Sequence, residues 1–220
     1  MLVVKYDQSK FDFKKHIEDL YDCNHLESLH LLIPEEISYS QLFKVGKDSS
    51  TIFHDKFYAK LNSGWDPFLN LYQQFVAYVV EQNYKPNDGD ILYQKTPTFR
   101  VHLPENLAVG AFHCDSDFNH PDGEENYIIP ITKMYGTNTV WCESDVGLLD
   151  FHPMPRLEFG ELFMFNGNKL RHGNLVNKTG KTRVSMDFRI IRKKDYDCSK
   201  KLESVTTKTK FEIGRYYEKL

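Results

Sequence analysis

Two histidines and one aspartate are the residues in this chain whose types and spacing indicate metal chemistry. His113 and Asp115 are separated by one residue, and His172 follows much later. If residues 108–115 form a strand, side chains two positions apart point to the same face, so His113 and Asp115 would reach one metal ion together. Two imidazoles and a carboxylate suit a mononuclear Fe(II) centre, with coordination positions left open for substrate and dioxygen. We therefore predict an iron site at these three residues.

The His-x-Asp pattern alone is weak, because the chain contains it twice. The second copy, His120-Pro-Asp122, lies in NHPDGEEN, whose proline and glycine indicate a turn. A turn does not hold both side chains toward one side, so we favour the first copy. Asp117 is a further rival, because it lies two residues beyond Asp115 and can share its face.

In the segment 182–191, residues 183–190 alternate between polar and apolar side chains, which is typical of a strand with one buried face. The polar set is Arg183, Ser185, Asp187 and Arg189, and the apolar set is Val184, Met186, Phe188 and Ile190. Arg183 and Ser185 can clamp a carboxylate with a guanidinium fork and a hydroxyl donor. A solvated strand face is the alternative, but the metal ligands upstream favour the clamp. His172 is expected on a segment that closes a hairpin, with its turn at Asn166-Gly167.

The composition indicates a folded protein without an electrostatic preference for nucleic acid. The 220 residues are 40% hydrophobic and carry a net charge of −3. The four cysteines show no Cys-x-x-Cys spacing, and the N-terminus does not read as a signal peptide, which predicts reduced thiols in a cytoplasmic compartment. No apolar run is long enough to span a membrane. We expect a small-molecule substrate as the partner, while the oligomeric state stays open.

The order of patterns predicts one domain, 1–220, in three parts. Residues 1–89 are expected to be mostly helical after an opening strand, with helices at 10–22 and from Asp66-Pro67 to about Asn83. Residues 90–192 contain short strands separated by turns, which favours a mainly β, jelly-roll core with the helices on one side. The tail, 193–220, ends in aromatic residues, so we expect it to dock, either as packing or as a lid over the pocket.

A series of segments between residues 90 and 217 carries a family resemblance. They read PTFRVHLP (97–104), AFHCDSDFNH (111–120), NTVWCES (138–144), GELFMFNGNKLRHGN (160–174), TRVSMDFR (182–189) and GRYY (214–217). Together they resemble the Fe(II)/2-oxoglutarate-dependent oxygenase superfamily, and within it the branch of streptomycin-biosynthesis oxygenase-like proteins. The resemblance implies a double-stranded β-helix fold.

The same resemblance implies roles for the five residues of the site. His113, Asp115 and His172 would bind Fe(II), and Arg183 and Ser185 would hold the distal carboxylate of the co-substrate 2-oxoglutarate. The implied reaction uses O2 and releases succinate and CO2, with hydroxylation as the favoured outcome. Halogenating relatives replace the carboxylate ligand with a small residue, and here Asp115 is present.

Strand parity adds substrate-contact candidates, and two alternative functions stay open. The candidates are Arg100, His102, Trp141, Asn174 and Arg189. Two spare arginines, Arg100 and Arg189, would indicate an anionic substrate. The alternatives are a cupin-like metal enzyme that does not use 2-oxoglutarate and a non-catalytic jelly-roll binding module. The identity of the substrate does not follow from the sequence.

Overall fold

The chain folds into two antiparallel β-sheets with helices along one side. The computed structural model describes residues 1–35, 37, 51–108, 111–205 and 208–220. In these residues the larger sheet has seven strands, in the order β1-β7-β4-β9-β2-β10 with β3 also paired to β9, and the smaller sheet has the order β6-β5-β8. The strands are β1 (Leu2–Lys5), β2 (Ile91–Gln94), β3 (Thr98–His102), β4 (Glu125–Pro130), β5 (Trp141–Cys142), β6 (His152–Pro153), β7 (Glu161–Phe165), β8 (His172–Gly173), β9 (Arg183–Arg192) and β10 (Tyr217–Lys219).

Strand β9 is central to the larger sheet and follows from its alternating sequence. Val184, Met186, Phe188 and Ile190 are all fully buried on one face. The polar set of β9 therefore points to the other face. Strands β3 and β4 lie beside β9, with Arg100 opposite Ser185 and Asn126 opposite Arg189. Directly opposed residues share a face, so both neighbouring strands add side chains to the polar side.

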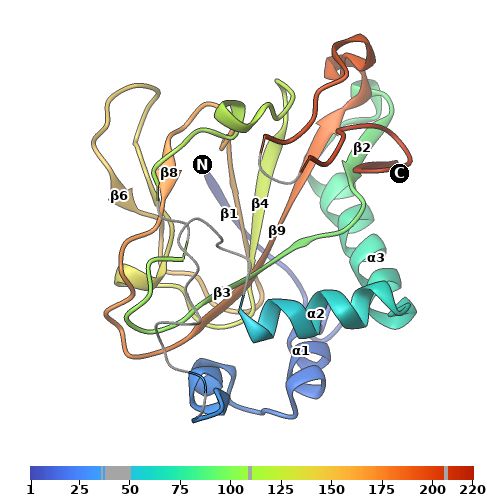
Figure 1. Cartoon of the computed structure of the whole chain (residues 1–220). Coiled ribbons are helices and arrows are strands. Elements are labelled where there is room, and N and C mark those ends of the chain that lie inside the picture. The colour runs from blue at the N-terminus through green and yellow to red at the C-terminus, as the bar shows by residue number, and fades with distance from the viewer. Residues whose placement is uncertain (36, 38–50, 109–110, 206–207) are drawn as a thin grey trace.

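The helices cover the apolar face of this sheet. They are α1 (Phe13–Tyr21), α2 (Ile52–Asn62) and α3 (Asp66–Asn83), with short 3₁₀ helices at Leu26–Leu32, Pro86–Asp88, Asp115–Phe118, Gly136–Asn138, Lys193–Asp195 and Cys198–Lys200. Phe57 of α2 stacks on Phe99 of β3 with ring centroids 4.2 Å apart, and Phe75 of α3 meets the edge of Phe188. Figure 1 shows the three α-helices on one side and strands β6 and β8 on the other.

The prediction of a mainly β chain with helices is confirmed, and the helix boundaries need correction. Helix α1 begins at Phe13 rather than at residue 10, and α3 ends at Asn83 as predicted. The N-cap of α3 is Trp65 instead of Asp66, which lies inside the first turn. Part of the predicted helical region, residues 36 and 38–50, lies outside the described residues.

The turn at Asn166-Gly167 exists but does not close a hairpin. The amide of Leu170 donates to the Asn166 carbonyl at 2.9 Å. Strand β7 before the turn pairs with β1 and β4, and β8 after it pairs with β5 in the other sheet. The turn therefore carries the chain from one sheet to the other, and this crossing places His172 opposite β9.

The C-terminal tail is docked by packing. Strand β10 adds to the outer side of β2, with Tyr217 opposite Gln94, and Figure 1 shows the C-terminus beside β2. Phe211 and Tyr217 are both buried. The thiols of all four cysteines are free. None of the helices in the described part of the chain combines the length and apolar composition that crossing a membrane requires.

Candidate metal centre

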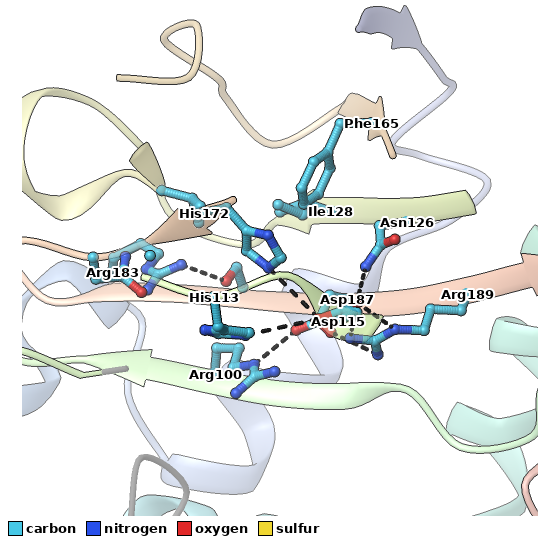
Figure 2. A pocket seen from close by; sticks show the side chains of 14 residues that line it. Arg100, His113, Asp115, Asn126, Ile128, Phe165, His172, Arg183, Asp187 and Arg189 are labelled. Carbon is cyan, nitrogen blue, oxygen red and sulfur yellow. Dashed lines mark hydrogen bonds and ion pairs between the residues drawn. The ribbon is translucent and has the colours of Figure 1, made fainter. Parts of the chain in front are cut away.

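A cavity of about 90 Å³ lies against the polar face of β9. All four polar residues of that face line it, together with the three predicted metal ligands: Arg183, Ser185, Asp187, Arg189, His113, Asp115 and His172. The sequence-predicted ligands and clamp therefore lie around a single space, as Figure 2 shows. The tail contributes no lining residue in the described part of the chain.

The three predicted ligands point their donor atoms toward one another (Figure 2). Asp115 Oδ1 lies 3.8 Å from His113 Nε2 and 3.7 Å from His172 Nε2. One ligand atom from each residue falls within 4.8 Å of the other two. Two imidazole nitrogens and one carboxylate oxygen on one side of a metal form the facial triad that leaves the opposite positions open.

The backbone brings these residues together differently from the predicted strand. His113 forms an isolated antiparallel bridge with His172, with both amide–carbonyl distances 2.9 Å. The chain then turns into the 3₁₀ helix Asp115–Phe118, and the amide of Asp115 donates to the Gly167 carbonyl at 2.9 Å. A bridge followed by a turn, rather than strand parity, aims His113 and Asp115 at the same point. Residues 109 and 110 of the predicted strand lie outside the described residues.

The rival carboxylates lie elsewhere. Asp117 Oδ2 accepts from the backbone amide of Cys114 at 3.0 Å and pairs with Arg171. His120 lies 2.8 Å from Glu124 through its Nδ1, and Asp122 is exposed. His120 and Asp122 therefore do not form a site together. His120 instead lies with Glu124 and Asp115 in a second group of side chains whose potential ligand atoms fall within 4.8 Å of one another.

Hydrogen bonds fix the tautomer of both histidines. His113 Nδ1 lies 2.9 Å from the Ala111 carbonyl oxygen, and His172 Nδ1 lies 2.9 Å from that of Leu170. A carbonyl oxygen only accepts, so each Nδ1 carries the proton and each Nε2 presents a lone pair. Burial lowers the pKa of His172, although the Asp115 carboxylate opposes this effect. Such backbone partners are the usual way that proteins orient metal-binding imidazoles.

The Asp115 carboxylate divides its two oxygens between support and the cavity. Oδ2 accepts from Asn126 at 2.7 Å and from Arg189 Nη2 and Nε at 2.7 and 3.0 Å. Burial alone would raise the pKa of Asp115, but the Arg189 guanidinium, with His172 and Asn126, holds it well below its usual range. The charged carboxylate thus keeps Oδ1 directed at the two Nε2 atoms.

Arg183 is a buried cation without a carboxylate partner among the described residues. Its side chain is 3% exposed. Nη1 donates to Ser185 Oγ at 3.3 Å, and Nε has no hydrogen-bond partner. Burial, and next the nearby Arg100, lower its pKa to about 10, so it is charged near neutral pH. Asp187 opposes this lowering, but no ion pair joins it to Arg183 among the described residues. A buried charge without an ion-pair partner is costly, so this end of the cavity favours an anion.

The five substrate candidates separate into three groups. Arg100 and Asn174 line the cavity, with Arg100 Nε donating to Asp187 Oδ1 at 2.8 Å. Arg189 also lines it, but its guanidinium is committed to Asp115, so the prediction that it is a spare cation is wrong. His102 and Trp141 are not among the lining residues. His102 Nε2 lies 2.7 Å from the Asn106 carbonyl oxygen, and Trp141 Nε1 donates to the Gly136 carbonyl at 3.3 Å.

Asn126 and Glu124 support the site but were not predicted. Asn126 bridges Asp115 and the amide of Gly167, and a Cβ at position 167 would lie 2.8 Å from its side chain, which explains the glycine. Glu124 is 1% exposed and lies 3.6 Å from Arg189. Both residues lie in the polar stretch Glu124–Asn126 that precedes the apolar residues of β4, so no local pattern marked them as buried.

Comparison with known proteins gives one clear sequence relative. No protein-family model matches the chain. It is 36% identical over 172 residues to the streptomycin biosynthesis protein StrG of Streptomyces griseus, an alignment that covers 78% of this chain and 77% of that protein. Among solved structures, a non-heme monooxygenase, ThoJ, in complex with nickel has a TM-score of 0.47 at 13% identity, over 86% of this chain and 73% of that one. The apo form of ThoJ has a TM-score of 0.46. Likeness at that level does not establish a common fold, so the relationship rests on the sequence relative.

Proposed function

The chain belongs to the family of the streptomycin biosynthesis protein StrG. We propose that it is an Fe(II)- and 2-oxoglutarate-dependent oxygenase that hydroxylates a small molecule. Fe(II) would be held by His113, Asp115 and His172, and 2-oxoglutarate by Arg183 and Ser185. In this proposal the two sheets are the walls of a double-stranded β-helix with the site between them.

The unpaired, buried guanidinium of Arg183 is the observation that carries the proposal. It lines the same cavity as the three converging ligand atoms. Charged groups are rarely buried without a partner, and a carboxylate that bridges from a metal to Arg183 would supply one. A dicarboxylate with a keto acid at its other end has the right charge at both ends.

The residues present fit an iron ion. Both imidazoles offer Nε2 lone pairs and the carboxylate offers Oδ1, a donor set typical of non-heme Fe(II). When bound, Fe(II) with 2-oxoglutarate and O2 would supply the oxidising power, with release of succinate and CO2. The protein's own contribution is to orient the reactants and to exclude competing reactions.

Two aromatic side chains pack against the imidazoles and hold this arrangement. Phe165 packs edge-on against the His172 ring at 5.2 Å, and Phe118 packs in the same way against His113 at 4.9 Å. Arg183 would orient the co-substrate with its planar guanidinium fork, and Ser185 would add a hydroxyl donor. No side-chain acid or base is required beyond these groups.

The substrate is proposed to be small, without a charge preference. The anionic substrate predicted from two spare arginines loses its basis, because Arg189 is paired with Asp115 and Arg100 with Asp187. The cavity is partly open to solvent, so a substrate could reach the metal position from outside while its remainder extends outward.

Succinate formation and thermal stability test the proposal together. We expect the protein with Fe(II), O2 and 2-oxoglutarate to release succinate, and expect 2-oxoglutarate to raise Tm only when Fe(II) or Mn(II) is present. Arg183→Ala should lose the 2-oxoglutarate effect and keep the metal effect, whereas Asp115→Ala should lose both. Arg156→Ala, which removes an exposed arginine, is the matched control.

Two outcomes would contradict the proposal. Metal binding without any response to 2-oxoglutarate, and without succinate, would favour a cupin-like metal enzyme of another kind. Absence of any metal effect on Tm, with Asp115→Ala unchanged in partner binding, would favour a non-catalytic binding module.

A further inference from the structure

A buried polar network links the C-terminal strand to the metal-ligand carboxylate. Tyr217 of β10 is fully buried, and its hydroxyl donates to Glu124 Oε1. Glu124 Oε2 lies 3.6 Å from Arg189 Nε, and Arg189 binds Asp115 Oδ2 through two N–H groups. A tyrosine close to the end of the chain is therefore connected to Asp115 through two charged side chains.

A second tail residue reaches the same arginine. Arg189 Nη1 lies 3.4 Å from both the Tyr216 hydroxyl and Gln94 Oε1, and the Tyr216 hydroxyl donates to Gln94 Oε1 at 3.0 Å. Gln94 is the residue that faces Tyr217 across the β10–β2 ladder. The tail thus places the Tyr216 hydroxyl beside Arg189 and the Tyr217 hydroxyl on Glu124, the second carboxylate near Arg189.

Glu124 competes with Asp115 for the same guanidinium, and Tyr217 limits this competition. Both carboxylates are almost completely buried, so each must find donors inside the protein. Glu124 receives one from Tyr217 on Oε1 and lies 2.8 Å from His120 Nδ1 on Oε2. With these partners in place, Arg189 can give both of its short hydrogen bonds to Asp115. Without the tyrosine hydroxyl, Glu124 would draw on the donors of Arg189 instead.

We propose that Tyr217 is a positioning residue for the metal centre: through Glu124 and Arg189 it orients Asp115, so that docking of the C-terminal strand and metal binding are coupled. This inference rests on the proposed function, because it takes Asp115 as a metal ligand. Coupling is reciprocal, so metal binding must in turn stabilise the docked strand.

The test compares two tyrosine-to-phenylalanine variants of the same tail. Tyr217→Phe removes the hydroxyl that enters the network. Tyr196→Phe is the matched control, since the Tyr196 hydroxyl donates to the Phe211 carbonyl at 2.7 Å and its ring contacts Tyr217. Both changes remove one tail hydrogen bond, but only one of these bonds leads to Asp115. Co(II) serves as the probe, because its visible absorption reports the geometry of its ligands.

We expect Tyr217→Phe to weaken Co(II) binding by about 3- to 10-fold and to shift the visible band, since groups that hold a metal ligand typically contribute 10- to 100-fold and this one acts at one remove. Glu124→Gln should weaken binding further, by about 10-fold or more. Tyr196→Phe should bind Co(II) as the wild type does. Saturating Co(II) should slow amide hydrogen exchange in residues 217–219 of the wild type and do so less in Tyr217→Phe.

Three results would overturn the inference, each in a distinguishable way. Co(II) binding by Tyr217→Phe equal to wild type, with an unchanged spectrum, would leave the metal site intact and refute the coupling. Equally weakened Co(II) binding in both tyrosine variants would mean that the tail supports the metal site only through general packing. Absence of Co(II) binding in the wild type would refute the proposed metal centre itself, and the coupling with it.

Discussion

Two arginines on one face of β9 have opposite surroundings. Arg183 and Arg189 are six positions apart, buried to a similar degree, and on opposite sides of Asp115 in Figure 2. Arg189 pairs with Asp115 and lies near Glu124, whereas Arg183 has only a serine hydroxyl and an unpartnered Nε. One is part of a completed polar network, and the other needs a ligand to complete its own. Burial of a charge therefore identifies a binding residue only when its partner is missing.

Replacing Arg189 with methionine should produce the largest loss of stability. Arg189→Met leaves the Asp115 carboxylate buried with Asn126 as its remaining close donor. Removing one partner of a buried ion pair costs about 3–5 kcal/mol. We expect urea unfolding of the metal-free variant to show a loss of this size, with weaker metal binding. Arg156→Met, at an exposed site, should change the unfolding free energy by less than about 0.5 kcal/mol. A loss below about 1 kcal/mol for Arg189→Met would mean that the network contributes little.

Replacing Arg183 with methionine should change the free energy of unfolding in the opposite direction. Arg183→Met removes a buried charge that forms no ion pair among the described residues, so the unfolding free energy of the ligand-free protein should rise by about 1–3 kcal/mol. The variant should also lose the increase in Tm that 2-oxoglutarate with Mn(II) gives to the wild type. Chemical unfolding with and without both ligands measures the two effects. A destabilisation similar to that of Arg189→Met would show that Arg183 already has a partner in the unliganded protein.

The sequence alone placed both arginines on one face but could not distinguish their roles. Alternation in residues 183–190 predicted β9 and its two faces, because side chains two positions apart in a strand point to the same side. Whether a guanidinium on that face is paired depends on contacts across the sheet. Glu124 and Asn126 come from β4 and the loop before it, and Tyr216 and Tyr217 come from the tail. No local pattern encodes these encounters.

The three residues predicted as metal ligands do converge, but the local structure that brings them together differs from the predicted strand. A strand at residues 108–115 was expected to align His113 and Asp115, whereas a single bridge to His172 and a 3₁₀ turn do so. The turn at Asn166-Gly167 was predicted from its dipeptide, but its role in joining two sheets depends on pairing with distant strands. The residue types were sufficient to predict which side chains converge. The backbone geometry that brings them together depends on pairing between distant segments.

His102 provides a pH-dependent probe of the Arg183 end. It lies opposite Arg183 across β3 and β9, and burial, with Arg183 as the second cause, lowers its pKa to about 3. The unfolded chain binds a proton near pH 6.5, while the folded protein does so only near pH 3. The contribution of neutral His102 to the free energy of unfolding is therefore complete above pH 6.5 and is lost as the pH falls toward 3.

We expect a loss of about 2 kcal/mol between pH 6.5 and 5 from His102 alone, at about 1.4 kcal/mol for each pH unit. Urea unfolding at both pH values measures it, with His102→Gln as the comparison because a glutamine can still donate to the Asn106 carbonyl. The variant should lose less stability over this interval. Equal losses in both proteins would show that His102 is able to take up a proton in the folded state.

Ser185→Ala should give the smallest effect of these variants. It separates the contribution of the serine to 2-oxoglutarate binding from that of Arg183. The Ser185 oxygen accepts from Arg183 Nη1, so its own proton is free to be donated to a ligand carboxylate. Loss of one such hydrogen bond costs about 1 kcal/mol, or about 5-fold in Kd. Calorimetric titration of the anaerobic Mn(II) protein with 2-oxoglutarate measures it, with the exposed Ser63→Ala as control. A change as large as that of Arg183→Met would mean that the serine fixes the guanidinium as well as the ligand. An unchanged Kd would leave Arg183 as the only clamp, and the contrast with the many-partnered Arg189 would become sharper.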